Sequence, residues 1–259
     1  TADYRDDILR LLFICCHPEL PPAQPLAAAP RIVPGLPVPQ IARAFLVSED
    51  AMEQRVTRAK QRIARAEVPF ETPDAAERAN RLAVVIASIY LVFNEGYSTA
   101  SEQAARSELC SEAIRLGRLL LRMYPDEPEL MGLLALMLLN HSRIDARFDP
   151  GGEIILLDAQ DRSRWNRDAI AEGLVLLDKA IRHRSPGPYQ IQAAIAALHA
   201  RAPTPAETDW HQIELLYATL ERLQPSPIVT LNRAVAVSKS RGPASALAMI
   251  DPLAGPLDH

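Results

Sequence analysis

The fold class is decided by residues 210–249, WHQIELLYATLERLQPSPIVTLNRAVAVSKSRGPASALAM. Its apolar residues recur at spacings of three and four, which is typical of helices with one buried face. Pro225, Pro227 and the pair Gly242-Pro243 divide it, and proline and glycine mark helix starts and stops. The stretch therefore predicts three consecutive short helices: Trp210–Leu223, Ile228–Ser240 and Pro243–Met249.

The same pattern extends toward the N-terminus. The chain has 22 prolines against 10 glycines, and most of the prolines fall between or at the start of helical segments. The sequence therefore predicts an all-α protein. Residues 149–158 are an exception, because a Gly-Gly turn precedes a short apolar run, and they could form a small hairpin or an extended loop. The further helices predicted are Asp6–Cys16, Pro39–Leu46, Glu49–Ala66, Asp74–Asn94, Ser101–Met123, Glu127–His141, Arg167–His183 and Pro188–Ala200.

The composition excludes several classes of protein. The chain has 259 residues, 48% hydrophobic residues and a formal net charge of −4, which is ordinary for a globular protein and not for a disordered one. No apolar stretch approaches the length of a membrane-spanning helix, so we expect no membrane association. Three cysteines cannot build a disulfide framework, which favours a cytoplasmic location.

The charge is unevenly distributed along the chain. Residues 1–66 carry nine basic against seven acidic side chains, a net charge of +2, which leaves −6 on the rest. Pro69 and Pro73 bracket an irregular stretch after the last basic helix. We therefore predict an N-terminal module at 1–66, a linker at 67–73 and a larger helical domain at 74–259.

Residues 39–66 are predicted to form a helix-turn-helix. Ser48 is a favourable N-cap for the second helix, and Glu49 and Asp50 follow it in the first turn. Arginines recur on one face of that helix, about 110° from its apolar face. A surface that packs on one side and presents arginines on the other suits contact with DNA phosphates, although a solvated surface helix gives the same stripe.

These residues carry a family resemblance. Residues 6–18 (DDILRLLFICCHP), residues 41–47 (IARAFLV) and residues 58–60 (RAK) resemble region four of sigma factors, in particular extracytoplasmic-function sigma factors with a C-terminal helical extension. The resemblance implies a module that reads the −35 promoter element in the major groove and binds RNA polymerase. The DNA-contacting candidates it implies are Gln54, Arg55 and Arg58. Lys60 and Arg62 of the same basic helix are further DNA-binding candidates.

The same resemblance implies a region two that opens the −10 element. There is no room for it before Thr1, so we expect the chain to be a fragment that could bind part of a promoter. Pro30, Pro34 and Pro37 depart from the family pattern just before the reading unit. They motivate an alternative, in which the helix-turn-helix is vestigial and the protein is an interaction scaffold.

Residues 210–249 loosely follow the tetratricopeptide repeat pattern, with small residues where two helices meet and glycine at the turn. Stacked helix pairs of this kind often present a surface to other proteins, although they can also simply fill a compact domain. The resemblance to the sigma-factor extension includes residues 93–97 (FNEGY) and residues 158–165 (DAQDRSRW). We therefore expect the C-terminal helical domain to bind a partner protein or to control sigma activity in cis.

The polar cluster at residues 158–165 supplies the second set of candidates. Its side chains could anchor a partner, or could form an internal ion-pair network that braces the loop. The candidate residues are Asp161, Arg162, Arg164 and Trp165. The sequence shows no nucleophile–base pair and no glycine-rich phosphate loop near this cluster, so we expect neither an enzyme nor a cofactor.

Two further groups of residues are given ordinary roles. Cys15-Cys16-His17 lacks a second ligand pair at zinc-finger spacing, so we expect buried thiols and no metal. His183 and His199 occupy helical positions without obvious companions.

Overall fold

A computed structural model of the chain describes residues 75–98 and 103–253. In these residues the protein is all-α, as predicted, with one isolated bridge between Phe148 and Ile154. Several predictions lie outside the described residues: the helices Asp6–Cys16, Pro39–Leu46 and Glu49–Ala66, the helix-turn-helix predicted at 39–66, and the linker at 67–73. The helices are α5 (Ala75–Ser98), α6 (Gln103–Met123), α7 (Pro128–His141), α8 (Arg167–Arg182), α9 (Pro188–Arg201), α10 (Trp210–Leu223), α11 (Pro227–Arg241) and α12 (Pro243–Ile250), with 3₁₀ turns η1 (Ile144–Ala146), η2 (Leu157–Ala159), η3 (Arg162–Arg164), η4 (Pro205–Glu207) and η5 (Asp251–Leu253).

The described helices belong to two compact units, which divide between Met123 and Tyr124. In the N-terminal unit, α5 packs against α6. The Sγ of Cys110 in α6 donates to the carbonyl oxygen of Phe93 in α5 at 3.6 Å, and both residues are fully buried. No helix in the described ranges combines the length and apolar character needed to cross a bilayer.

The C-terminal unit is built around α7. Its ten residues from Leu130 to Leu139 are all buried, as expected for a helix that is apolar on every side. It packs against α8 and α9. Gly132 allows the close approach to α9, because a Cβ there would lie 2.7 Å from the backbone nitrogen of Gln190.

The start of α9 is capped by a side chain from α7. Gly187 at the N-cap has no side chain, and Pro188 follows it. Glu129 supplies the missing acceptor, because its carboxylate accepts from the backbone nitrogens of Tyr189 at 3.1 Å and Gln190 at 3.2 Å. A carboxylate at this end of a helix is also favoured by the helix dipole. This long-range cap fixes α7 and α9 relative to each other.

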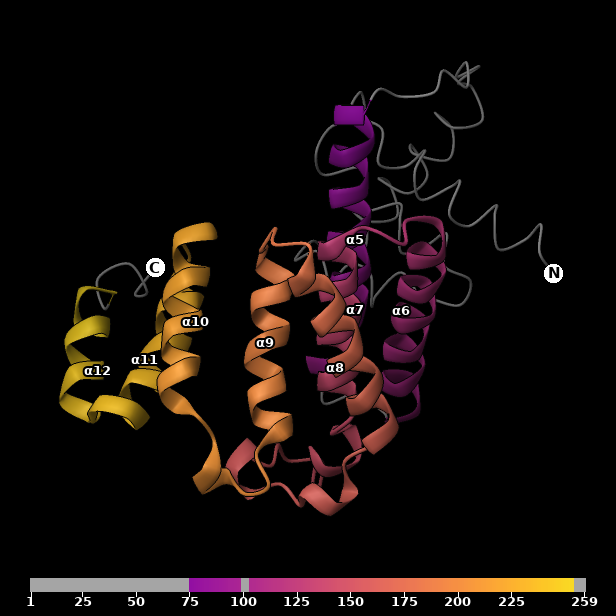
Figure 1. The fold of residues 1–259 in the computed structure, drawn as a ribbon. Coiled ribbons are helices and arrows are strands. Elements are labelled where there is room, and N and C mark those ends of the chain that lie inside the picture. The colour runs from indigo at the N-terminus through magenta and orange to yellow at the C-terminus, as the bar shows by residue number, and fades with distance from the viewer. Residues whose placement is uncertain (1–74, 99–102, 254–259) are drawn as a thin grey trace, which may run out of the picture. The chain divides into compact units, whose positions relative to one another are not determined.

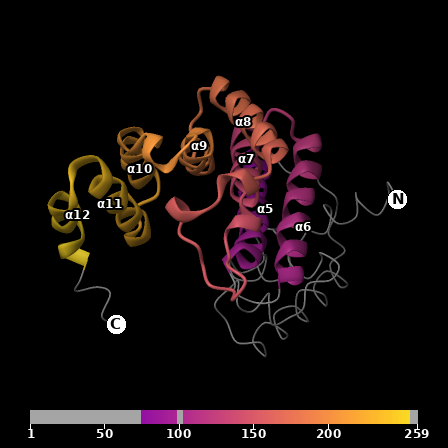
Figure 2. The ribbon, with the colours of Figure 1, turned by 90° about the horizontal axis from the view of Figure 1, so that it is seen from below.

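From α8 onward the helices follow one another side by side, as Figures 1 and 2 show. One buried apolar cluster joins α9, α10 and α11. It consists of Ile191, Ile195, Ile213, Leu220 and Ala236. A second cluster joins α11 to α12. The turn between α11 and α12 uses Gly242, whose φ of +93° favours glycine.

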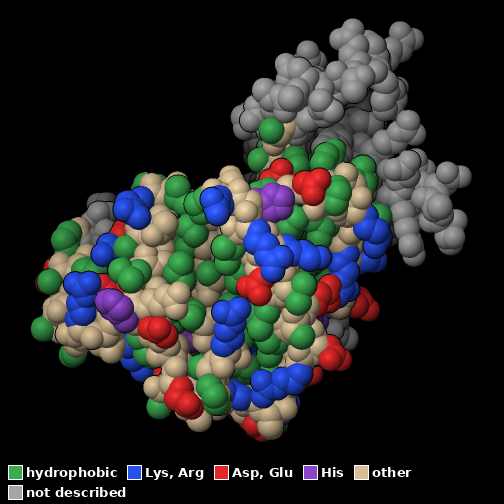
Figure 3. All heavy atoms as spheres, viewed as in Figure 1, with side chains coloured by type: hydrophobic (Ala, Val, Ile, Leu, Met, Phe, Trp, Pro, Cys, Tyr) green, Lys and Arg blue, Asp and Glu red, His purple; other side chains and the backbone are tan. Residues whose placement is uncertain are grey.

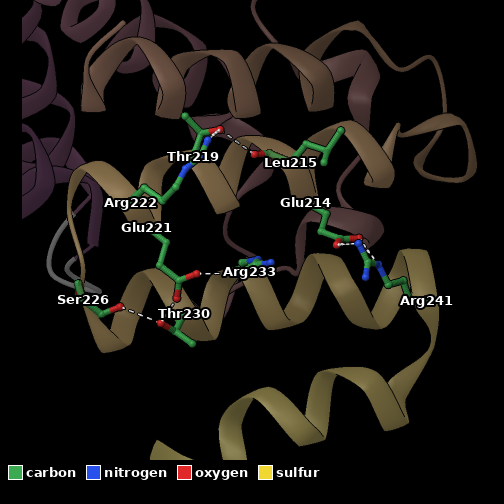
Figure 4. Close-up of polar contacts among 9 residues, drawn as sticks. All are labelled: Glu214, Leu215, Thr219, Glu221, Arg222, Ser226, Thr230, Arg233 and Arg241. Atoms are coloured by element: carbon green, nitrogen blue, oxygen red, sulfur yellow. Dashed lines mark hydrogen bonds and ion pairs between the residues drawn. The ribbon is translucent and has the colours of Figure 1, made fainter.

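Polar contacts also join α10 to α11 (Figure 4). Glu221 of α10 accepts from the hydroxyl of Thr230 and from Nη1 of Arg233 at 2.7 Å. Near the start of α10, Glu214 forms a salt bridge with Arg241 at the end of α11. The two helices are therefore held by carboxylates at both ends of an apolar seam.

Candidate functional site

The candidate site lies in the segment that connects α7 to α8, residues 142–166. Its ends are tied together, since the backbone nitrogen of Asn166 donates to the carbonyl oxygen of Ser142 at 2.7 Å. The Gly-Gly stretch forms a tight turn closed by the Phe148–Ile154 bridge, with Gly152 at a φ of +86°. The sequence allowed a small hairpin or an extended loop, and the structure has a turn with a single bridge and no strand in the described residues. The rest of the segment consists of short 3₁₀ turns.

Asp161 and Arg164 lie on the surface of this segment. The carboxylate of Asp161 accepts from the backbone nitrogen of Ser163 at 2.9 Å and from its hydroxyl at 2.7 Å. These bonds, and then the nearby charge of Arg164, lower the pKa of Asp161. Asp161 thus fixes the start of η3, while Arg164 is exposed and remains accessible.

Arg162 points into the protein. Its Nη1 donates to the carbonyl oxygens of His199 and Ala202, each at 2.7 Å, at the C-terminal end of α9. Its guanidinium carbon lies 4.5 Å from the centre of the Trp165 ring. Cations are favoured at the C-terminal end of a helix and over an indole face. Arg162 therefore braces the segment against α9, through carbonyls and an aromatic ring and not through the ion pairs considered from the sequence.

Trp165 is buried, with 3% of its surface exposed. Its ring serves as the apolar anchor of the segment. Among the four candidates, then, Arg162 and Trp165 have internal contacts, and Asp161 and Arg164 face solvent.

Residues from other helices complete the site, and local sequence patterns did not predict them. His199 of α9 packs edge-on against Trp210 of α10, with ring centres 5.2 Å apart. Burial, followed by the charges of Arg143 and Arg162, lowers the pKa of His199 to about 4, so its imidazole is neutral at pH 7.

A salt bridge ties the segment to α11. Nζ of Lys239 lies 3.0 Å from the carboxylate of Asp158 and also sits 5.7 Å from the Trp210 ring centre. The signal available in the sequence was weak: an isolated lysine on a helix and an aspartate 81 residues away. Only the packing of α9, α10 and α11 brings them together.

The remaining predicted residues are placed as follows. The DNA-contacting candidates Gln54, Arg55, Arg58, Lys60 and Arg62, and also Cys15-Cys16-His17, lie outside the described residues. Within residues 75–98 and 103–253, no group of three or more His, Cys, Asp or Glu side chains is arranged to hold a metal ion.

Comparisons with known proteins give two matches. Residues 81–181 match the model described as "Family of unknown function (DUF6596)". The chain is also 66% identical over 253 residues to "Uncharacterized protein R00370" of Rhizobium meliloti (strain 1021). The match covers 97% of this chain and 60% of the relative, so the chain spans about three fifths of the length of that protein. No solved structure matches at a significant level.

Proposed function

We propose that this chain is part of a sigma factor, in which residues 1–66 recognise the −35 promoter element and bind RNA polymerase. The helical domain that follows contacts a protein, either polymerase or a regulator, and controls sigma activity in cis. No catalytic step and no cofactor belong to this role. The first half of the proposal is supported by the capped, arginine-striped helix predicted at 49–66 and by the resemblance to sigma region four.

The second half is supported by one surface of the C-terminal unit. Ile228 and Val235 lie seven residues apart, hence on one face of α11, and are 69% and 55% exposed. The opposite face of the same helix is buried through Ala234 and Val237. A repeat-like helix that exposes an apolar row beside its packed face is suited to binding a protein segment. Figure 3 shows apolar side chains intermixed with basic and acidic ones on the face of α9 and α10.

The promoter half of the proposal predicts a salt-dependent effect of two arginines. In the chain carrying Arg55→Ala and Arg58→Ala, binding to a duplex with a −35 element is expected to weaken at least tenfold. Each phosphate contact contributes roughly 0.9 to the slope of log K against log salt, so the slope should fall by about 2. Fluorescence anisotropy at a series of salt concentrations measures both quantities.

The matched control is Lys179→Ala with Arg182→Ala, which removes two exposed basic side chains of α8. It should leave DNA binding unchanged. Replacing Arg55 and Arg58 with lysine should keep the salt slope and lose any base-specific contact. Affinity and slope equal to those of the wild type in the double alanine variant would show that these arginines do not contact DNA.

A protein-interaction scaffold is the second candidate function. It is favoured by three prolines just before the predicted helix-turn-helix, Pro30, Pro34 and Pro37, which suggest that this module no longer binds DNA. The exposed apolar row on α11 suits a scaffold equally well. The two proposals differ in whether RNA polymerase core is a partner.

A further inference from the structure

Three arginines gather where the segment between α7 and α8 begins and ends. The hydrogen bond between Asn166 and Ser142 brings the neighbouring residues Arg143 and Arg167 close to Arg162. Nη2 of Arg167 donates to the backbone carbonyl of Arg162 at 3.2 Å. Burial, and then the charges of Arg143 and Arg167 against that of Asp158, lower the pKa of Arg162. The fold therefore holds like charges together at a cost in free energy.

None of the three arginines forms an ion pair with a carboxylate in the part of the chain that the structure describes. Nη2 of Arg143 donates to the side-chain oxygen of Asn140 at 2.7 Å, and Arg162 bonds to backbone carbonyls. Two carboxylates of the same segment have other partners. Asp161 accepts from the backbone nitrogen of Ser163, and Asp158, whose charge acts on Arg162, pairs with Lys239.

The donors at the centre of the cluster are also not satisfied by the protein. Nε and Nη2 of Arg162 are buried without an acceptor, and so is Nε1 of Trp165. Nε and Nη2 form the edge of a guanidinium that binds the two oxygens of a carboxylate or phosphate side by side. Buried donors that lack an acceptor are costly, and most folded proteins avoid them. Here they occur together with excess positive charge, and Arg167, one of the three arginines, is exposed.

We propose that Arg143, Arg162, Arg167 and the indole N–H of Trp165 form a binding site for an oxyanion, a carboxylate or phosphate group. The Nε–Nη2 edge of Arg162 takes two of its oxygens, and Arg143 and Arg167 neutralise its charge. The site lies wholly within the C-terminal unit and does not depend on the promoter proposal.

The indole signals of the chain provide a direct test. The chain has two tryptophans, so its ¹⁵N-labelled form gives two indole N–H signals, and Trp210→Phe assigns that of Trp165. Inorganic phosphate, succinate and a peptide rich in Asp and Glu are titrated separately, with ionic strength held constant by chloride. We expect a saturable shift of the Trp165 signal with at least one of these probes. The probe that binds identifies the source of the oxyanion. A shift with phosphate alone indicates a phosphate group, a shift with succinate indicates a small carboxylate, and a shift with the peptide alone indicates an acidic protein segment.

Variants separate a specific site from general charge. Arg143→Ala and Arg167→Ala should each weaken binding about tenfold, because each removes one charged partner of the anion. Arg162→Lys should abolish the saturable shift, since lysine lacks the two-donor edge. Arg182→Ala, at an exposed position at the other end of α8, is the matched control and should bind like the wild type.

Two results would overturn the proposal. One is the absence of a saturable Trp165 shift with all three probes up to about 50 mM. The other is binding in Arg143→Ala and Arg167→Ala with the affinity of the wild type. Because Arg167 is exposed, its replacement is compatible with a folded protein even if Arg162→Lys is not.

Discussion

Replacing Gly132 with alanine is expected to destabilise the C-terminal unit by about 3 kcal/mol. The new Cβ would lie 2.7 Å from the backbone nitrogen and 2.9 Å from the Cα of Gln190, and backbone atoms at the start of α9 cannot move aside as a side chain can. Helix propensity alone would raise the stability by about 1 kcal/mol, because alanine is a better helix former than glycine. A net loss of stability would therefore come from the packing contact. Urea unfolding followed by tryptophan fluorescence reports on this unit, since it contains Trp165 and Trp210.

Gly173→Ala is the matched control on the neighbouring helix. Its Cβ would lie 3.0 Å from Cγ of Leu139 and 3.3 Å from the carbonyl oxygen of Ala135, which are looser contacts than those at Gly132. We expect a loss of about 1 kcal/mol or less. Equal stability of Gly132→Ala and the wild type would contradict the close contact between α7 and α9.

Removing Arg241 is expected to destabilise the pair α10–α11 by about 2 kcal/mol. Glu214 is buried, with 1% of its surface exposed, and Arg241 binds both of its oxygens, at 2.5 and 3.1 Å. Arg241→Ala leaves a buried carboxylate with the Ser240 hydroxyl, at 2.6 Å, as its remaining side-chain donor. Because Arg241 is 58% exposed, water replaces part of the lost interaction, which lowers the expected cost. Figure 4 shows the pair of Glu214 and Arg241.

Two variants make this test specific. Arg222→Ala removes an exposed arginine of α10 whose side chain donates to the hydroxyl of Thr219 at 3.2 Å, and should change stability by less than about 0.5 kcal/mol. Glu214→Leu combined with Arg241→Met replaces the buried pair with apolar side chains, and should recover most of the loss. Urea unfolding of the wild type and of these three variants measures this. A double variant less stable than Arg241→Ala would contradict the interpretation.

The same pair predicts a pH dependence. The hydrogen bond from Ser240, and further Arg241, hold the pKa of Glu214 below its ordinary value of 4.5, against the effect of burial. A lowered folded-state pKa adds stability above the unfolded pKa, and this contribution is lost as the pH falls through the folded value. The stability difference between wild type and Arg241→Ala should therefore shrink below about pH 4.5.

The helices of the described region were largely predictable from sequence, because their boundary signals are local. Pro128, Pro188, Pro227 and Pro243 each begin a helix, and the predicted Trp210–Leu223 has the observed bounds. What could not be predicted are contacts between distant residues. Glu129 caps α9 from 60 residues away, and Arg162 reaches Ala202 from 40 residues away. Such contacts depend on how helices pack and leave no local pattern.

The sequence singled out residues 158–165 and allowed an internal bracing role for them, but it did not predict which contacts they make. The density of charge around residues 158–165 singled out Arg162 and Trp165, and the structure gives both of them internal contacts. Arg143 and Arg167 were missed, because the Asn166–Ser142 bond that brings them together joins the two ends of a long segment. The promoter-reading residues remain predictions from the sequence.

Binding to RNA polymerase core tests the central proposal most directly. Biolayer interferometry with immobilised core enzyme and the 259-residue chain measures it, with a housekeeping sigma factor as competitor. The proposal predicts saturable binding that is lost when the competitor occupies the core. No binding at about 10 μM chain, or binding that the competitor leaves unchanged, would contradict a sigma-type role and favour the scaffold.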